Sequence, residues 1–267
     1  MYALLTQGGF PGEWSWVLAA LLGAAFLAGF IDSIVGGGGL IQIPMLFSVF
    51  PGVPPALLLG TNKLASVFGT SAAAFQYLRR VEVAWNTVLP ATAAALVFAF
   101  LGAWTVTQIP PDFLRRALPF ILAAVALYTF KRKDFGALHA PKHAGQGERV
   151  RGAAVGGAIG FYDGFFGPGT GSFLIFVFVR FFGFDFVRAS AAAKVVNVAC
   201  NLAAIAWFAS AGKIAVGLAL TMAVANVSGA LVGSRLALAR GTGFVRQIFL
   251  IVVVLLILKT GYDAFIH

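Results

Sequence analysis

The stretch GFIDSIVGGGGLIQIP at residues 29–44 decides the fold, because it places an acidic residue and four consecutive glycines inside an apolar segment. A closely similar stretch, GFYDGFFGPGTGSF, follows 131 positions later at residues 160–173. The same ungapped shift pairs Asp32 with Asp163 and Lys63 with Lys194. Chance matches of glycine are common in such a composition, but chance matches of rare charged residues are not. The chain is therefore predicted to consist of two related halves.

The composition indicates an integral membrane protein. Of the 267 residues, 60% are hydrophobic and only 10% are charged, whereas soluble domains carry about 25% charged residues. Several apolar segments are long enough, with their flanks, to form transmembrane helices. The net charge of +10 comes from basic residues at segment ends and in loops, which the positive-inside rule explains without a nucleic-acid partner. The single cysteine, Cys200, excludes a disulfide framework within the chain.

The predicted fold is an all-α polytopic membrane protein whose halves share one order of segments. The first half, residues 1–131, has apolar segments at residues 14–35, 40–50, 56–78, 83–107 and 114–130. The second half, residues 152–267, has them at residues 152–166, 171–182, 189–211, 214–236 and 245–262. The polar stretch between them, residues 132–151, is rich in basic residues and is predicted to be a cytoplasmic linker.

The short second segment of each half leaves two topologies open. As a helix, residues 40–50 would cover only about half of the hydrocarbon core. If both short segments cross the membrane, the chain has ten spans in two inverted five-helix repeats, with both termini outside. If they are re-entrant, it has four plus four spans in parallel halves. The ten-span topology is favoured because it keeps most loop arginines inside. These are Arg79, Arg80, Arg180, Arg188, Arg240 and Arg246.

Two aspartates and two lysines lie well inside the apolar segments. A charge at the bilayer centre costs about 3 kcal/mol or more, so such residues are functional by default. Asp32 and Asp163 are candidates for anchoring the lysines or for carrying coupling protons, and Lys63 and Lys194 for binding an anion. The alternative explanation is that the four residues form two structural ion pairs at the centre of the bundle.

The glycine-rich breaks at residues 36–39 and 167–171 are predicted to line a substrate site. Irregular backbone is tolerated at membrane depth only where protein buries it or where it lines a cavity. Each break opens a short helix whose free N–H groups and positive dipole end favour an anion. The predicted substrate-binding residues are Gly37, Gly38, Gly39, Gln42, Asn62, Lys63, Ser66, Gly169, Thr170, Gly171, Ser172, Lys194 and Asn197, with Thr61 and Asn201 close to them.

These motifs resemble the TauE/SafE family of sulfite exporters and sulfonate permeases, and most closely its YfcA-like branch. The resemblance rests on the two glycine-containing stretches, on TNKLASVFGTS at residues 61–71, on KVVN at residues 194–197 and on NVSGALVGSRLAL at residues 226–238. It implies a bacterial inner-membrane transporter of sulfur-containing anions such as sulfite or sulfonates. It fixes neither the substrate nor the direction of transport.

The expected function is secondary transport of a small sulfur oxyanion by alternating access, with protons as a candidate coupling ion and without a cofactor or metal. A cation transporter that uses Asp32 and Asp163 is the alternative, although the matching lysines would repel a cation. A membrane-embedded enzyme has less support, because the histidines fall in the predicted linker or tail at His139, His143 and His267. The small-residue face at residues 229–233 is compatible with internal packing or with a homodimer.

Overall fold

The computed structural model describes residues 15–114, 116–117 and 146–266, and all the regular elements within them are helical. Most of the predicted linker therefore lies outside the described residues, as does most of the segment predicted at residues 114–130. His139, His143 and His267 lie outside them too, and so does the side chain of Arg246.

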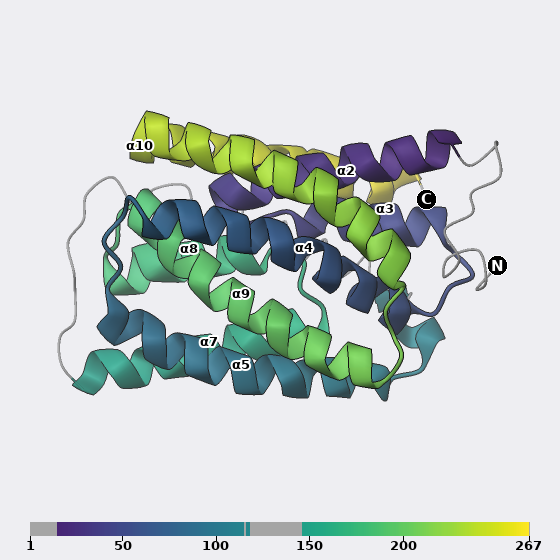
Figure 1. The fold of residues 1–267 in the computed structure, drawn as a ribbon, viewed down its shortest axis with the longest axis horizontal. Helices are drawn as coiled ribbons and strands as arrows, with labels where there is room; N and C mark the ends of the chain where they lie inside the picture. The colour runs from purple at the N-terminus through teal and green to yellow at the C-terminus, as the bar shows by residue number, and fades with distance from the viewer. Residues whose placement is uncertain (1–14, 115, 118–145, 267) are drawn as a thin grey trace.

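The helices lie side by side in one elongated bundle (Figure 1). They are α2 (Ser15–Val35), α3 (Gly39–Val49), α4 (Pro55–Leu78), α5 (Trp85–Thr107), α7 (Gln146–Phe165), α8 (Thr170–Phe182), α9 (Phe186–Ser210) and α10 (Val216–Ile266). Helix α10 is interrupted at Gly241, which has a φ of 71°. The two segments predicted at residues 214–236 and 245–262 are thus separate helices on either side of this kink.

The internal repeat extends to the starting points of the helices. Helices α7, α8, α9 and α10 begin at Gln146, Thr170, Phe186 and Val216, each 131 positions after the start of α2, α3, α4 and α5 respectively. One boundary differs from the prediction, since α7 begins well before residue 152. Its first turn contains Glu148, which accepts a hydrogen bond from Thr87 of α5 and lies at the positive end of the helix dipole.

The surface of the bundle is that of a multi-pass membrane protein. Four described helices are long and apolar enough to span a membrane: Trp16–Val35, Trp85–Thr107, Phe186–Ser210 and Val216–Val245. Large apolar side chains such as Leu27, Leu96 and Val224 are exposed on its outside. Helices α3 and α8 are shorter, at 11 and 13 residues. They measure about 16 and 20 Å, less than the roughly 30 Å of a hydrocarbon core.

Helix α3 folds back along α2. A Cβ on Gly38, just before α3, would lie 2.8 Å from the Cβ of Asp32 in α2. Further along, Leu46 and Phe50 share an apolar cluster with Leu21 and Ala25, nearer the start of α2. The two short helices lie toward opposite ends of the bundle, α3 at the right and α8 at the left of Figure 1.

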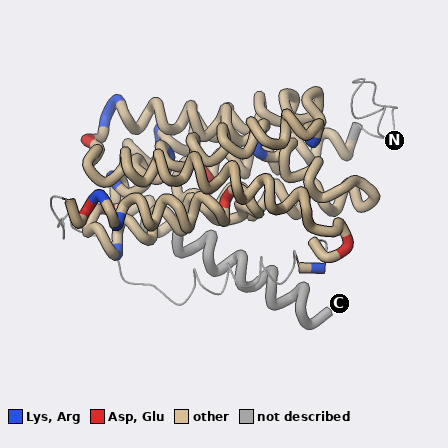
Figure 2. The backbone as a smooth tube through the Cα atoms, turned by 90° about the horizontal axis from the view of Figure 1, so that it is seen from below, with Lys and Arg blue, Asp and Glu red and all other residues tan. Residues whose placement is uncertain are grey.

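Equivalent loops also lie at opposite ends of α4. The α4–α5 loop meets the start of α9 in a pocket lined by Glu82 and Arg188. The α9–α10 loop meets the start of α4, where the N–H of Ala215 donates to the Thr61 hydroxyl at 3.0 Å. Lys and Arg residues gather at one end of the bundle, with a few in the middle and at the other end (Figure 2).

The two halves are packed through glycine. Helix α7 lies along α5, and a Cβ on its Gly164 would lie 1.9 Å from the carbonyl oxygen of Ala99. Helix α10 lies along α2, and a Cβ on its Gly229 would lie 2.0 Å from the carbonyl oxygen of Phe26. The small-residue face at residues 229–233 therefore packs within the chain, against α2.

Candidate functional site

The two glycine-rich breaks contact each other between the halves. The N–H of Ser172 donates to the carbonyl oxygen of Gly36 at 2.9 Å. Gly36 and Gly167 have φ values of 81° and 89°, in the left-handed region that favours glycine. A Cβ on Gly36 would lie 2.2 Å from the carbonyl carbon of Gly171. Glycine is therefore required where the two breaks cross.

A polar cavity of about 30 Å³ lies at this crossing. It has room for about two water molecules. Both halves contribute to its wall, which includes most of the predicted site residues. Those that line it are Asp32, Gly38, Gly39, Asn62, Lys63, Ser66, Asp163, Gly169, Thr170, Gly171, Asn197 and Asn201.

Two helix N-termini converge on this cavity. Gly39, the first residue of α3, and Thr170, the first residue of α8, both line it. The helix dipole makes this end of each helix positive. Several first-turn N–H groups already donate to backbone carbonyls, those of Leu40 and Ile41 in α3 and those of Thr170 and Ser172 in α8, so the dipole contributes more here than free donors do. Neither helix has an acidic residue in its first turn. The geometry at both helix ends thus favours a negatively charged ligand.

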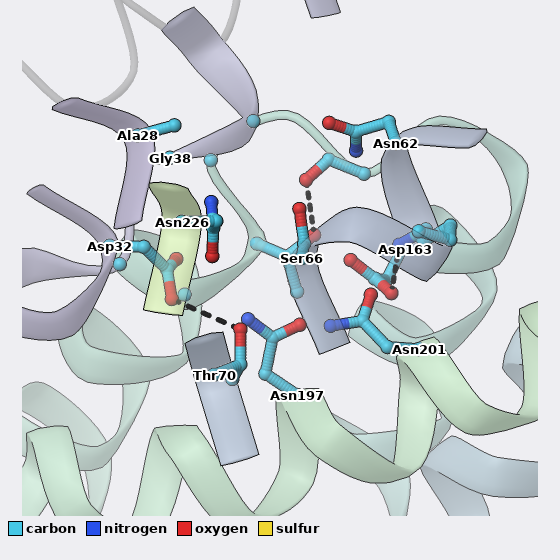
Figure 3. A pocket seen from close by; sticks show the side chains of 17 residues that line it. Ala28, Asp32, Gly38, Asn62, Ser66, Thr70, Asp163, Asn197, Asn201 and Asn226 are labelled. Carbon is cyan, nitrogen blue, oxygen red and sulfur yellow. Dashed lines mark hydrogen bonds and ion pairs between the residues drawn. The ribbon is translucent and has the colours of Figure 1, made fainter. Parts of the chain in front are cut away.

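Lys63 and Asp163 form an ion pair at the wall of the cavity. The Lys63 Nζ lies 2.5 Å from Asp163 Oδ2, and their side chains are 5% and 2% exposed. Lys63 belongs to α4 and Asp163 to α7, so the pair joins the two halves. Figure 3 shows Asp163 and Asp32 on opposite sides of the cavity, with Ser66 and Asn197 between them.

Lys194 and Asp32 form the second pair, with a different geometry. Lys194 is completely buried and its ammonium group donates to the backbone carbonyl of Asp32 as well as to its carboxylate. The Nζ–Oδ2 distance is 3.3 Å, and the Asp32 side chain is 16% exposed. The hydroxyl of Thr70 also donates to this carboxylate, at 3.3 Å. Asp32 faces the cavity, whereas Lys194 lies behind it.

The last carbonyl groups of α2 are each bonded by a side chain. The last carbonyls of a helix generally lack partners within it, and a membrane interior offers little water to replace one. The donors are Lys194, Tyr77, Ser190 and Ser172, to the carbonyls of Asp32, Ser33, Ile34 and Val35 in that order. Of these four carbonyls, that of Asp32 also accepts a hydrogen bond from the N–H of Gly36 at 2.8 Å. Lys194 and Ser172, both predicted to bind substrate, thus serve in this structure to complete the end of α2.

The hydrogen-bond donors at the end of α7 and in the break after it differ from those at the end of α2. At the positions equivalent to Tyr77 and Ser190, the other half has the apolar residues Phe208 and Leu59. Instead, the α7–α8 break is bonded by its own neighbours: the Tyr162 hydroxyl donates to the carbonyl of Pro168 at 2.6 Å, and Thr170 to that of Gly167 at 3.0 Å. The two breaks occupy equivalent positions in the sequence, but their backbone carbonyls have different hydrogen-bond donors.

Three other predicted residues lie outside the cavity wall. The amide oxygen of Gln42, fully buried, accepts a hydrogen bond from Asn226 at 3.2 Å. The Thr61 hydroxyl donates to the carbonyl of Leu57 at 2.6 Å within α4, and it accepts a hydrogen bond from the N–H of Ala215, which joins α4 to the loop before α10. A Cβ on Gly37 would meet side chains at 3.7 Å, those of Ile31, Leu40 and Ser172.

Two polar residues of the cavity wall were not predicted. Thr70 lies one helical turn after Ser66 and occupies the position that Asn201 has in the other half. Because Asn201 had been placed close to the site, its equivalence to Thr70 could have identified Thr70 from the sequence. Asn226 of α10 lines the cavity and also donates to the carbonyl of Ala25 at 3.1 Å. The sequence signal for Asn226 was its amide side chain within an apolar segment.

The cavity retains one unsatisfied group. The side-chain oxygen of Asn62 is buried and has no hydrogen-bond partner among the described residues. A buried acceptor without a donor is costly, so a water molecule or another group that donates a hydrogen bond to this oxygen would be favoured. The described residues contain no cluster of three or more His, Cys, Asp or Glu side chains that could hold a metal ion.

Comparison with known proteins agrees with a membrane transporter. A family model described as "Sulfite exporter TauE/SafE" matches residues 21–260. A probable membrane transporter protein, ORF9, from Sinorhizobium sp. is 40% identical over 247 residues, which cover 92% of this chain and 93% of that protein. The probable membrane transporter protein YfcA of Escherichia coli K12 is 36% identical over 252 residues, 93% of this chain and 91% of YfcA. No solved structure gives a significant match.

Proposed function

The chain belongs to the TauE/SafE family of membrane transporters, and from this premise we propose that it carries a small sulfur-containing anion, such as sulfite or a sulfonate, across the bacterial inner membrane. The observation that carries this proposal is the convergence of two helix N-termini and Lys63 on one buried polar cavity. Sulfite and sulfonate oxygens accept hydrogen bonds from N–H and O–H donors, which this wall supplies.

The amides and hydroxyls of the wall complete the proposed anion site. Asn62, Ser66, Asn197 and Asn201 project from α4 and α9, one helix from each half. Each can donate to an oxyanion. Lys63 adds a charge, although its ion pair with Asp163 offsets part of it. The helix termini and uncharged donors therefore contribute much of the attraction in this proposal, and Lys63 orients the anion.

The proposed topology is ten spans in two inverted repeats. Its support is that equivalent elements lie toward opposite ends of the bundle: the short helices α3 and α8, and the loops that contain Glu82 and Lys213. The end with more Lys and Arg residues would face the cytoplasm. On this topology α3 and α8 each begin near the middle of the membrane and run toward opposite faces.

Two features support alternating access: the small size of the cavity and the apolar clusters that lie to either side of it. A sulfite ion has four non-hydrogen atoms and needs more room than about two water molecules, so the cavity must expand to bind it. Apolar clusters lie to either side, one containing Phe178, Phe182 and Phe184 and the other Leu46 and Phe50. We propose that these clusters separate one at a time, which exposes the site to each face in turn.

Flux through the purified protein tests this function. The protein is reconstituted in liposomes, and uptake of radiolabelled sulfite is measured with methanesulfonate, sulfate and divalent cations as competitors. Saturable uptake that sulfur anions inhibit, and that Lys63→Ala reduces strongly but Lys213→Ala does not, is the expected result. Lys213 is a matched control because it lies in a loop outside the cavity. Uptake of divalent cations without uptake of anions would overturn the proposal.

A further inference from the structure

The charges around the cavity balance when the site is empty. Lys63 and Lys194 offset Asp163 and Asp32, and these residues form two cross-half pairs. A bound anion would leave one net negative charge in a small, mostly buried space, where electrostatic interactions are strong. Taking up one proton with the anion restores the balance. The two aspartates are the carboxylates in the wall that could accept it.

The two aspartates differ in how firmly their charge is held. Asp163 has a side chain that is 2% exposed, and its carboxylate lies 2.5 Å from the ammonium group of Lys63. Asp32 has a side chain that is 16% exposed, and its carboxylate lies 3.3 Å from both Lys194 and Thr70. The carboxylate of Asp163 is thus held by one close contact, whereas that of Asp32 is more open and more loosely bonded.

Protonation also has different consequences for the two lysines. Lys194 donates to the backbone carbonyl of Asp32 as well as to its carboxylate, so it keeps a partner when that carboxylate is neutral. Lys63 donates to the carboxylate of Asp163 itself. Neutralising Asp163 would weaken the bond that holds a buried ammonium group, which is strongly unfavourable.

We propose that Asp32 binds the proton that accompanies the anion, while Asp163 stays ionised beside Lys63. This inference rests on the proposed anion transport and names its coupling site. Asp32 takes a proton from the water that enters with the anion, and releases it when the anion leaves on the other side. In its protonated form the carboxyl group can donate a hydrogen bond to an oxyanion. The charged and hydrogen-bonding groups that face Asp32 are Lys194 of α9, Thr70 of α4 and Asn226 of α10, with Lys63 and Asp163 across the cavity.

The sign of the pH dependence follows from linkage. If the anion-bound form holds one more proton than the free form, anion affinity increases as the pH falls, by about tenfold per pH unit at most. The Asp32→Asn variant imitates the protonated carboxyl, so it should bind the anion with an affinity that does not vary with pH. The Asp163→Asn variant should keep the dependence on pH, whatever its affinity.

The test is binding of methanesulfonate to the purified full-length protein over a series of pH values. Methanesulfonate does not itself titrate near neutral pH. Wild type and the control Glu82→Gln, an exposed acidic residue outside the cavity, should bind more tightly as the pH falls, and Asp32→Asn should not. A pH dependence that persists in Asp32→Asn would overturn the inference.

A second measurement keeps the inference testable if Asp163→Asn does not fold. Adding methanesulfonate to wild type in weak buffer should raise the pH, because about one proton is taken up per anion bound, and Asp32→Asn should show no such change. Anion binding without proton uptake in wild type would overturn the coupling role of Asp32 and leave anion transport standing. Failure of wild type to bind or transport any sulfur anion would overturn the proposed function and this inference with it.

Discussion

Lys63 and Asp163 are 100 residues apart in the chain and belong to different halves, yet their side chains meet at 2.5 Å in the cavity wall. The matching pair, Lys194 and Asp32, also joins one half to the other. Each half thus supplies the lysine for the aspartate of its partner half. The cavity is therefore formed jointly by the two halves, as an alternating-access site between two moving parts requires.

Replacement of Lys63 by alanine should reduce both anion transport and stability. A hydrogen bond to a charged group contributes about 1.5–3 kcal/mol, and each 1.4 kcal/mol is about tenfold in affinity. The expected loss of anion affinity is therefore roughly tenfold or more. Stability should fall by about 3–5 kcal/mol, because Asp163 is left buried without its partner. Flux and thermal unfolding in detergent measure the two effects.

The double variant Lys63→Ala, Asp163→Ala separates the two effects of that change. Removing both charges should recover most of the lost stability, because no unpaired buried charge remains. Transport should stay low, because the lysine is still absent. Recovery of transport together with stability would show that Lys63 has only a structural role.

Tyr77→Phe should destabilise the protein by about 1–3 kcal/mol, because it leaves a buried carbonyl group without its donor. The Tyr77 hydroxyl donates to the Ser33 carbonyl at 3.1 Å and is fully buried. Denaturation in detergent measures the change. Phe68→Leu on the exposed face of the same helix is the control, and an equal loss of stability in both variants would contradict this role of Tyr77.

Gly36→Ala should prevent correct folding, whereas Gly23→Ala within the preceding helix α2 should be neutral or slightly stabilising. A Cβ on Gly36 would overlap the Gly171 backbone, and Gly36 has a positive φ. Gly23 is in the interior of α2 with nothing within 4 Å of its added Cβ, and alanine is favoured over glycine there by about 1 kcal/mol. Size-exclusion chromatography of the two purified variants compares their folding: Gly23→Ala should give a single symmetrical peak and Gly36→Ala should aggregate. A well-folded Gly36→Ala protein would mean that the two breaks do not cross as described.

Cysteine labelling tests the inverted arrangement. Glu82 and Lys213 occupy equivalent positions, 131 residues apart, in the loops before α5 and α10. In a Cys200→Ala background, Lys213→Cys should react with a membrane-impermeant maleimide in intact cells. Glu82→Cys should react only after the membrane is permeabilised. Labelling of both from the same face would indicate parallel halves.

The sequence predicted the elements of this fold well because membrane helices are marked by local features. The helix starts follow the 131-residue shift seen in the sequence, and the glycine breaks lie where residues 36–39 and 167–171 indicated them. The start of α7 was misplaced because its first turn is polar, with Glu148 bonded to Thr87, and does not resemble a membrane span.

Which residues face the cavity was harder to predict, because this depends on tertiary packing. Lys63 and Lys194 are equivalent in sequence, but Lys63 lines the cavity while Lys194 completes the end of α2. The difference comes from the neighbours: Tyr77 and Ser190 bond the end of α2, whereas the equivalent Phe208 and Leu59 cannot bond the end of α7. A repeat in the sequence fixes equivalence of position but not of environment.

An anomalous-difference map from crystals grown with selenite, a heavier analogue of sulfite, tests the central claim most directly. The account predicts a selenium peak between the first residues of α3 and α8, Gly39 and Thr170, within hydrogen-bonding reach of Asn62 or Lys63. A peak at another place in the bundle, with this cavity free of selenium, would contradict it.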